Sequence, residues 1–209
     1  MSDPGRRVLD VSDLPTHAFA PRDPMMWGAL GLVAIESTMF ALCWASLLYL
    51  RGNFVPYPPT ALPRSIAVSG AIEVLLLLAT LPPTHWMNGA AEAGKLRPMR
   101  RAVTLSVALQ GATLLVRAWT LGHLPFRWDT HAHGSMVWLT AGMHTVHLVT
   151  GFVEEAVLLV LLFKGPVLEK HQTDIHTTGY YWYFVVAWWI PTYLLLYVDP
   201  LLFPRTGLP

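Results

Sequence analysis

Six acidic or histidine side chains lie well inside long apolar runs of the chain, where an acid or an imidazole needs a reason to be present. An ionisable group in hydrocarbon is costly unless it is paired or neutralised inside a helix bundle, so such groups mark functional sites by default. Carboxyl and imidazole groups in this setting can transfer protons, bind a metal ion, or only fix helix packing. The six are Glu36, Glu73, His144, His147, Glu154 and Glu155.

The histidine pair is the candidate for metal chemistry. His144 and His147 are three residues apart and therefore share one face of a helix. Two imidazoles at this spacing can begin a metal site, which would make the chain a membrane metalloenzyme. The other histidines lie at the outer end of the same run, in the tail, at the ends of other runs or in loops: His17, His85, His123, His131, His133, His171 and His176. A haem or metal site needs more ligands at one depth, so we expect no redox centre in this chain.

The two acids nearest the N-terminus are the candidates for proton chemistry. Glu36 and Glu73 each lie about ten residues into an apolar run, or about 15 Å from its end. Each could be a protonated carboxyl that only fixes packing, or a coupling acid of a small transporter. We expect Glu36 to be buried, largely protonated and within reach of the histidine pair, directly or through water. Gln110 and Arg117 are expected to satisfy buried partners or, for Arg117, to extend to the membrane surface.

The elements that position these groups are predicted to be membrane-spanning helices. Hydrophobic residues make up 54% of the chain and charged residues only 13%, against roughly a quarter in a soluble domain. Five apolar runs are long enough to cross about 30 Å of hydrocarbon at 1.5 Å per residue. The sequence therefore predicts an all-α polytopic protein, with a polar tail (1–24) and a single five-helix membrane domain (25–203). The predicted spans are residues 25–50, 64–86, 101–122, 134–163 and 179–202.

Charge decides the orientation and excludes other classes of protein. Nine of the 14 Lys and Arg residues fall in the tail and in the two connections on the same side, against four on the opposite side. Positive residues are retained in the cytoplasm, so the N-terminus is predicted to be cytoplasmic and the C-terminus periplasmic. A net charge of +1 without a basic block argues against a nucleic-acid partner. The single cysteine, Cys43, allows neither an intrachain disulfide nor a Cys-based metal site.

The fourth span has a local pattern that resembles a known family. Residues 133–151 read H-G-S-M-V-W-L-T-A-G-M-H-T-V-H-L-V-T-G. This run resembles the signature of cytochrome c oxidase subunit III, which is like Y-G-S-x-F-x-x-x-T-G-F-H-G-x-H-V-x-x-G. The residues in register are Gly134, Ser135, Gly142, His144, His147 and Gly151.

Other matches occur in the same order along the chain. The fifth span opens on Y-W-Y-F-V-V-A-W-W, which resembles the family's Y-W-H-F-V-D-V-V-W. Glu36 stands in a stretch similar to S-E-x-x-F-F, and Tyr57 begins a Y-P-P stretch where the family has W-P-P. The matches in the fifth span are Tyr181, Trp182, Phe184 and Trp189. The departures are Tyr183 for His, Val186 for Asp, and Thr120 for a buried acid.

The resemblance covers roughly residues 25–200 and implies both a fold and a role. It implies the short five-helix bacterial form, in which a two-helix arm and a three-helix bundle enclose a cleft that holds phospholipid. It also implies an accessory subunit of a respiratory haem-copper oxidase in the bacterial inner membrane. That subunit would pack beside subunit I and near subunit II, stabilise proton uptake, and leave haem and copper to its partner. The alternatives are a proton-coupled transporter using Glu36 and Glu73, and a subunit of a nitric-oxide-reductase-like complex.

Overall fold

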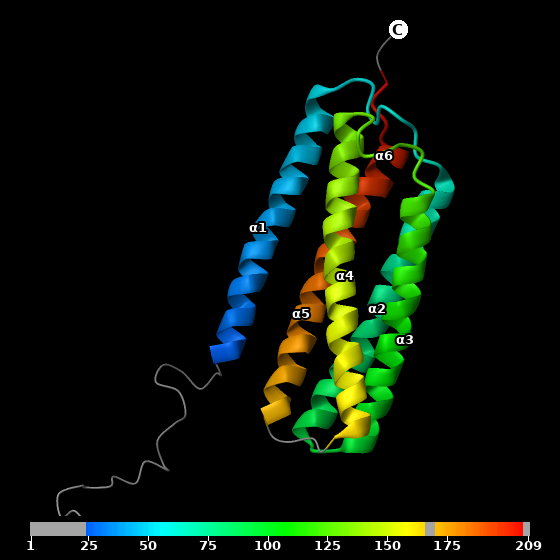
Figure 1. Cartoon of the computed structure of the whole chain (residues 1–209). Helices are drawn as coiled ribbons and strands as arrows, with labels where there is room; N and C mark the ends of the chain where they lie inside the picture. Colours follow the sequence, from blue (N-terminus) through cyan, green and yellow to red (C-terminus); the bar gives the residue numbers. More distant parts are fainter. Residues whose placement is uncertain (1–23, 166–169, 207–209) are drawn as a thin grey trace, which may run out of the picture.

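The computed structural model describes residues 24–165 and 170–206, so the predicted cytoplasmic tail lies outside the described residues. Five long helices run nearly side by side along one axis (Figure 1), and each is long and apolar enough to cross a membrane. This confirms the predicted all-α polytopic fold. The helices are α1 (Pro24–Asn53), α2 (Arg64–Glu92), α3 (Leu96–Gly122), α4 (Ala132–Lys164) and α5 (Lys170–Tyr193), followed by the π-helical turn η1 (Leu194–Val198) and α6 (Asp199–Leu202).

Several helices extend beyond the predicted apolar spans. The helix α2 continues through Pro82 and Pro83 to Glu92, and α3 follows almost at once. The reversal between them uses Gly94, whose φ of 63° lies in the left-handed region that favours glycine. The amides of Gly94 and Lys95 donate to the carbonyls of Ala91 and Ala90, which satisfies the last turn of α2. Hydropathy marks where a helix leaves hydrocarbon, whereas this turn marks where the helix ends.

The helices form a four-helix bundle with a fifth helix on its outside. The helix α2 packs against α3 and α5, and α4 packs against the same two helices. The helix α1 packs against α4 and α5 instead of α2, and it stands at the edge of the molecule in Figure 1. The predicted two-helix arm of the first two spans is therefore wrong for this chain. The helix α2 packs against α3 instead of α1 because the polar interior described below joins α2 to α3.

The outer helix α1 contributes only a narrow stripe to the core. Its fully buried apolar residues are Phe40, Cys43 and Leu47, which recur every three or four positions and so share one face. Phe40 reaches furthest, because its ring stacks on Trp188 of α5 at 5.3 Å between centroids. Most other α1 side chains are exposed on the described chain, so α1 presents a broad apolar surface to lipid or to another protein.

The last span changes its helical geometry after a proline. Pro191 has no amide to donate to the carbonyl of Ala187, and three residues later the chain adopts a π-helical turn. The following segment is held at the end of the bundle that carries the connection after α1. There, Tyr57 and Arg205 exchange backbone hydrogen bonds of 2.8 and 2.7 Å, and Arg51 pairs with Asp199 at 2.6 Å. These contacts join the C-terminal end of α1 and the connection after it to the C-terminal segment of the chain.

Candidate functional site

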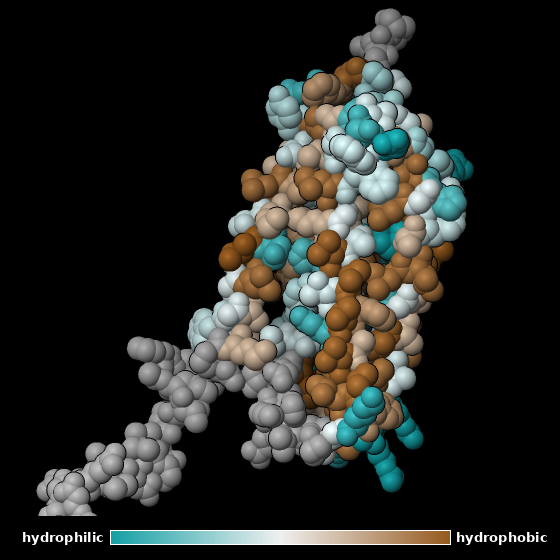
Figure 2. All heavy atoms as spheres, in the orientation of Figure 1, coloured by the Kyte–Doolittle hydropathy of each residue, from teal (hydrophilic) through white to brown (hydrophobic). Residues whose placement is uncertain are grey.

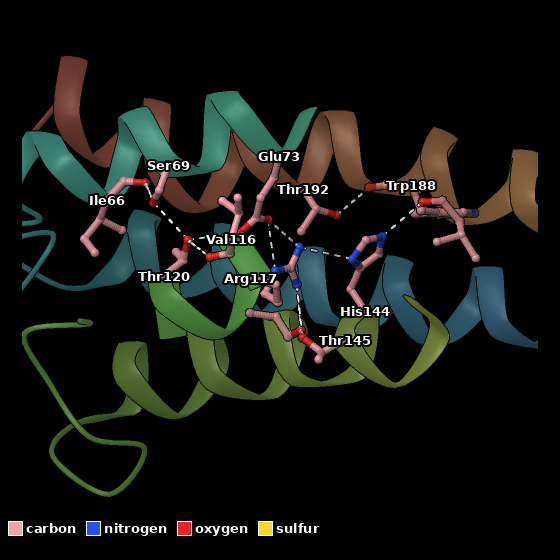
Figure 3. A network of polar contacts seen from close by, with 12 residues as sticks. Ile66, Ser69, Glu73, Val116, Arg117, Thr120, His144, Thr145, Trp188 and Thr192 are labelled. Carbon is pink, nitrogen blue, oxygen red and sulfur yellow. Dashed lines mark hydrogen bonds and ion pairs between the residues drawn. The ribbon is translucent and has the colours of Figure 1, made fainter. Parts of the chain in front are cut away.

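The centre of the bundle is built around Arg117 of α3, which is fully buried. Its Nε and Nη2 donate to Oε2 of Glu73 on α2, at 2.9 and 2.7 Å. Its Nη1 donates to the carbonyl of Ala141 and to the hydroxyl of Thr145, and its second Nη2 proton faces Nδ1 of His144. All five guanidinium N–H donors therefore have acceptors (Figure 3). The predicted extension of Arg117 to the membrane surface is wrong, and the predicted buried partners are present.

Glu73 is as completely enclosed as its partner, with a side-chain exposure of 0%. One carboxylate oxygen accepts from Arg117, and the other lies 3.0 Å from the hydroxyl of Thr120. That hydroxyl also lies 2.9 Å from Ser69 of α2, and its single proton can serve one of these acceptors at a time. Glu73 on α2 thus supplies a carboxylate beside position 120 of α3, where the sequence has Thr instead of the acid of the resembling pattern.

His144 lies between the ion pair and α5. Its Nε2 lies 3.1 Å from the carbonyl of Val185, which can only accept, so Nε2 carries a proton. Its Nδ1 is then free to accept from Arg117, 3.3 Å away, and this pattern fits the neutral imidazole. The ring stacks on Trp189 at 4.4 Å, and the guanidinium of Arg117 lies 3.7 Å from the centre of that same indole. Both nitrogens of His144 are therefore engaged within the protein.

A second acid and imidazole contact each other where α1 packs against α4. Glu36 Oε2 lies 3.2 Å from Nε2 of His147, which is the predicted contact between the two helices. The other ring nitrogen lies 2.7 Å from the carbonyl of Met143 and must donate to it. The contact with Glu36 therefore needs one further proton, either on the carboxyl or on the imidazole. Unlike Glu73, Glu36 is only partly buried, with 22% of its side chain exposed, which corrects the expectation of full burial.

The two consecutive acids of α4 have opposite environments. Glu155 is buried, with 2% exposure, and its Oε2 accepts from Ser106 and Gln110 of α3. Glu154 is exposed on the described chain, which corrects the prediction that it is buried. It follows His147 by seven residues and so lies on the same helix face. Glu36 contacts His147, and Tyr181 lies 3.4 Å from the carbonyl of His147, so both approach the same turn of α4.

No family model matches the chain. Proteins named cytochrome c oxidase subunit 3 are similar to it over much of its length. The protein from Pisaster ochraceus is 24% identical over 187 residues, which cover 87% of this chain and 72% of the relative. The protein from Thermostichus vulcanus is 24% identical over 186 residues, covering 87% and 90%. The protein from Corynebacterium diphtheriae is 30% identical over 129 residues, covering 60% and 63%.

The similarity to proteins named cytochrome c oxidase subunit 3 is low but extends over most of the chain, which is consistent with a divergent member of that family. The similarity extends through most of the membrane domain, in which the polar groups described above lie. The low sequence identity agrees with a polar interior that differs from the subunit III pattern at several positions. Of these, Val186 is buried in the hydrophobic core, and Thr120 contacts Glu73.

Residues of the subunit III pattern mostly occupy places where helices approach closely. A Cβ on Gly151 would lie 2.8 Å from the ring of Trp182, and a Cβ on Gly134 would lie 2.9 Å from the carbonyl of Arg127. The indole of Trp182 donates to Thr80 of α2 at 2.6 Å. By contrast, a Cβ on Gly142 would meet nothing within 4 Å. Gly151 thus allows α4 and α5 to pack closely, and Gly142 has no such role in the described chain.

The remaining residues of that pattern have distinct contacts. Ser135 is exposed and donates to the carbonyl of Trp128, which fixes the turn before α4. Tyr181 donates weakly to the carbonyl of His147 at 3.4 Å. The rings of Phe40, His147 and Phe184 contact one another pairwise. These aromatic contacts join α1, α4 and α5.

The geometry argues against the metalloenzyme alternative. The ring nitrogens of His144 face Arg117 and Val185, and those of His147 face Met143 and Glu36. Among the described side chains of residues 25–165 and 175–206, no three His, Cys, Asp or Glu gather as metal ligands would. The histidine pair is therefore committed to helix packing and to proton-sharing contacts.

Proposed function

We propose that the chain is an accessory, non-catalytic subunit of a respiratory haem-copper terminal oxidase. It packs beside the catalytic subunit I, with subunit II as a further neighbour, and stabilises that subunit and its proton uptake. Haem and copper reside in the partner, where oxygen is reduced and protons are pumped. The relatives named cytochrome c oxidase subunit 3 support this role. The chain lies in a bacterial inner membrane with its N-terminus cytoplasmic, as the distribution of Lys and Arg indicates.

The observation that carries the proposal is the exposed carboxyl of Glu154. It lies ten residues before Lys164, about 15 Å along the axis of a helix that crosses the membrane. Hydrophilic groups interrupt the hydrophobic surface on the side of α4 that faces α1 (Figure 2). A carboxyl turned toward hydrocarbon is disfavoured unless a neighbour offers a hydrogen bond or a charge. A partner helix packed on this face supplies that neighbour.

The pairing of Glu36 with His147 supports the link to proton uptake. The contact needs one proton between a carboxyl and an imidazole, and it is partly exposed on the same helix face as Glu154. A partner seated there would complete its burial and hold α1 against α4. A phospholipid bound between α1 and α4 would also complete the burial of this contact, with its headgroup or its acyl chains. Phospholipid binding is part of the proposed role.

The transporter alternative is weakened by Glu73. A coupling acid must exchange its proton with water, but this carboxylate is enclosed and paired with Arg117. Nothing on the described chain favours a nitric-oxide-reductase-like complex over an oxidase, and that alternative differs only in the partner.

Gentle solubilisation followed by affinity capture of the tagged full chain tests the proposal. We expect haem-containing subunits to co-purify and to give a visible haem spectrum. Replacement of Glu154 with Ala should lower the haem recovered per chain, because the partner loses its polar contact. Replacement of Glu92, an exposed acid at the end of α2, with Ala is the matched control and should leave recovery unchanged. Capture of an intact chain without haem subunits would contradict the proposed function.

A further inference from the structure

A groove with three arginines runs between α3 and α4 at the end of the bundle opposite the connection after α1. It has a volume of about 540 Å³ and opens to the surface of the chain. Figure 2 shows hydrophilic side chains projecting at this lower end, directly beside a hydrophobic surface. The residues that line the groove are Arg97, Arg100, Arg101, Thr104, Leu105, Ala108 and Phe163.

Arg100 is fixed at the wall of this groove. Its Nε donates to the carbonyl of Leu162 at 2.7 Å, a group near the C-terminal end of α4 that lies outside the repeating helical pattern. Its guanidinium also lies 5.0 Å from the centre of the Phe163 ring. These contacts use one N–H and one face of the guanidinium, so its Nη groups stay near the groove. Arg100 thereby ties α3 to α4 and holds a positive charge in place.

Arg97 and Arg101 add charge that the described chain does not neutralise. They are one turn apart on the same face of α3, and both side chains are exposed. Among the side chains of residues 25–165 and 175–206, no carboxylate forms an ion pair with either of them, and the groove lining contains no acid. The groove therefore has a concentrated positive charge at its polar end.

The polarity of the groove changes along the helix axis. From Arg97 to Ala108 the lining extends about 16 Å along α3 toward the middle of the bundle, at 1.5 Å per residue. The arginines occupy the first turn and a half, Thr104 follows, and the part nearer the middle of the bundle is formed by Leu105 and Ala108. This length is close to half of a hydrocarbon core of about 30 Å. A molecule that fits must be anionic at one end and apolar along the rest.

We propose that this groove binds one anionic phospholipid, whose phosphate contacts the three arginines and whose acyl chain lies along Leu105 and Ala108. Basic pockets between transmembrane helices are suited to such headgroups, because several guanidinium groups can contact one phosphate. A zwitterionic headgroup is a poorer ligand, since its amine brings positive charge next to the arginines. The site differs from that of a lipid bound between α1 and α4 and does not depend on the oxidase assignment. Only the choice of the cytoplasmic leaflet rests on the proposed orientation.

Lipid titration of the purified full chain in a neutral detergent, read by native mass spectrometry, tests this site. The probes are dioleoyl phosphatidylglycerol, dioleoyl phosphatidylethanolamine and sodium phosphate. We expect one phosphatidylglycerol per chain, bound roughly tenfold more tightly than the zwitterionic lipid with the same acyl chains. Millimolar phosphate should not displace it, because the apolar half of the groove contributes to binding.

A double variant, Arg97→Gln with Arg101→Gln, should weaken phosphatidylglycerol binding by roughly 10- to 30-fold. It keeps Arg100 and therefore the contact between α3 and α4. The matched control is Arg64→Gln with Arg127→Gln, which removes two exposed charges from the opposite end and should leave this binding unchanged. Elution volume and helical circular dichroism check that both variants fold, and the lipid preference of the unchanged chain needs no variant.

Several outcomes would overturn the assignment. Equal binding of both lipids would mean a general annular position, and full displacement by phosphate would mean an inorganic anion site. An equal loss in the control variant would mean that total charge, not the groove, attracts the lipid. Cross-linking of Arg101 to another subunit in a complex that retains no such lipid would mean a protein contact.

Discussion

Glu73 and Glu36 are both acids in membrane helices, but their surroundings differ in almost every respect. Glu73 is fully enclosed, accepts from a guanidinium that has all its donors satisfied, and links α2 to α3. Glu36 is partly exposed, shares a proton with one imidazole, and links the outer helix α1 to α4. Depth in the bilayer therefore does not decide the role of an acid in a membrane helix. The number of partners and the remaining exposure indicate which acid holds the fold and which one faces outward.

The largest effect should follow from breaking the buried ion pair on one side. Replacing Arg117 with Met leaves the carboxylate of Glu73 enclosed without a cation, and such a loss costs about 3–5 kcal/mol. Thermal denaturation of the purified chain in detergent should therefore show a large fall in the midpoint temperature.

The double variant Arg117→Met with Glu73→Leu is the control for this prediction. It removes both charges and should recover much of the lost stability, because no unpaired charge remains. A double variant that is as unstable as the single variant would show that Arg117 acts through packing on Trp189, not through Glu73.

A smaller effect should separate two glycines of the subunit III pattern in α4. Alanine at Gly151 would press on the ring of Trp182, and overpacking of this kind costs about 1–3 kcal/mol. Alanine at Gly142 meets open space and should be neutral or stabilising by up to about 1 kcal/mol, because Ala favours a helix. Midpoint temperatures of the two variants, measured side by side, check the difference. Equal destabilisation would mean that α4 and α5 do not pack as closely as described.

The smallest effect on stability should come from Glu36. Glutamine keeps the shape and can donate to Nε2 of His147, so Glu36→Gln should leave assembly and turnover nearly intact. Alanine loses the hydrogen bond and should destabilise the chain by about 1 kcal/mol, as expected for a partly exposed contact. Denaturation midpoints and initial oxidase turnover of the purified complex check both variants. A Gln variant that assembles normally but loses most turnover in its first cycles would assign Glu36 a direct role in proton transfer.

Hydropathy and spacing were sufficient to predict the five spans and the contact between Glu36 and the histidine face. Both follow from helix length and periodicity, which the local sequence encodes. The pairing of Glu73 with Arg117 was not predicted, because 44 residues separate them and neither span carries a sign of its neighbour. The presence of one acid and one base, each unusual in a span, was the signal available.

Two other errors have related physical causes. The two-helix arm came from a resemblance, and such a resemblance does not say which helix carries the residues that tie it to the bundle. Glu154 and Glu155 were both expected on the buried polar face of the fourth span, but consecutive residues on a helix point about 100° apart and can face lipid and core. Ser106 was missed as a partner of Glu155, although it stands one turn before Gln110 on the same face.

In the proposed function, the face of α4 around Glu154 binds the haem-containing subunit, whereas the surface of α3 around Leu115 faces lipid. A photo-crosslinking residue at Val153, which is 51% exposed beside Glu154, tests this most directly. The control position is Leu115 of α3, which is 75% exposed. Irradiation of intact membranes should join the chain to the haem-containing subunit from position 153 and only to lipid from position 115. A crosslink to that subunit from position 115 alone would contradict the account.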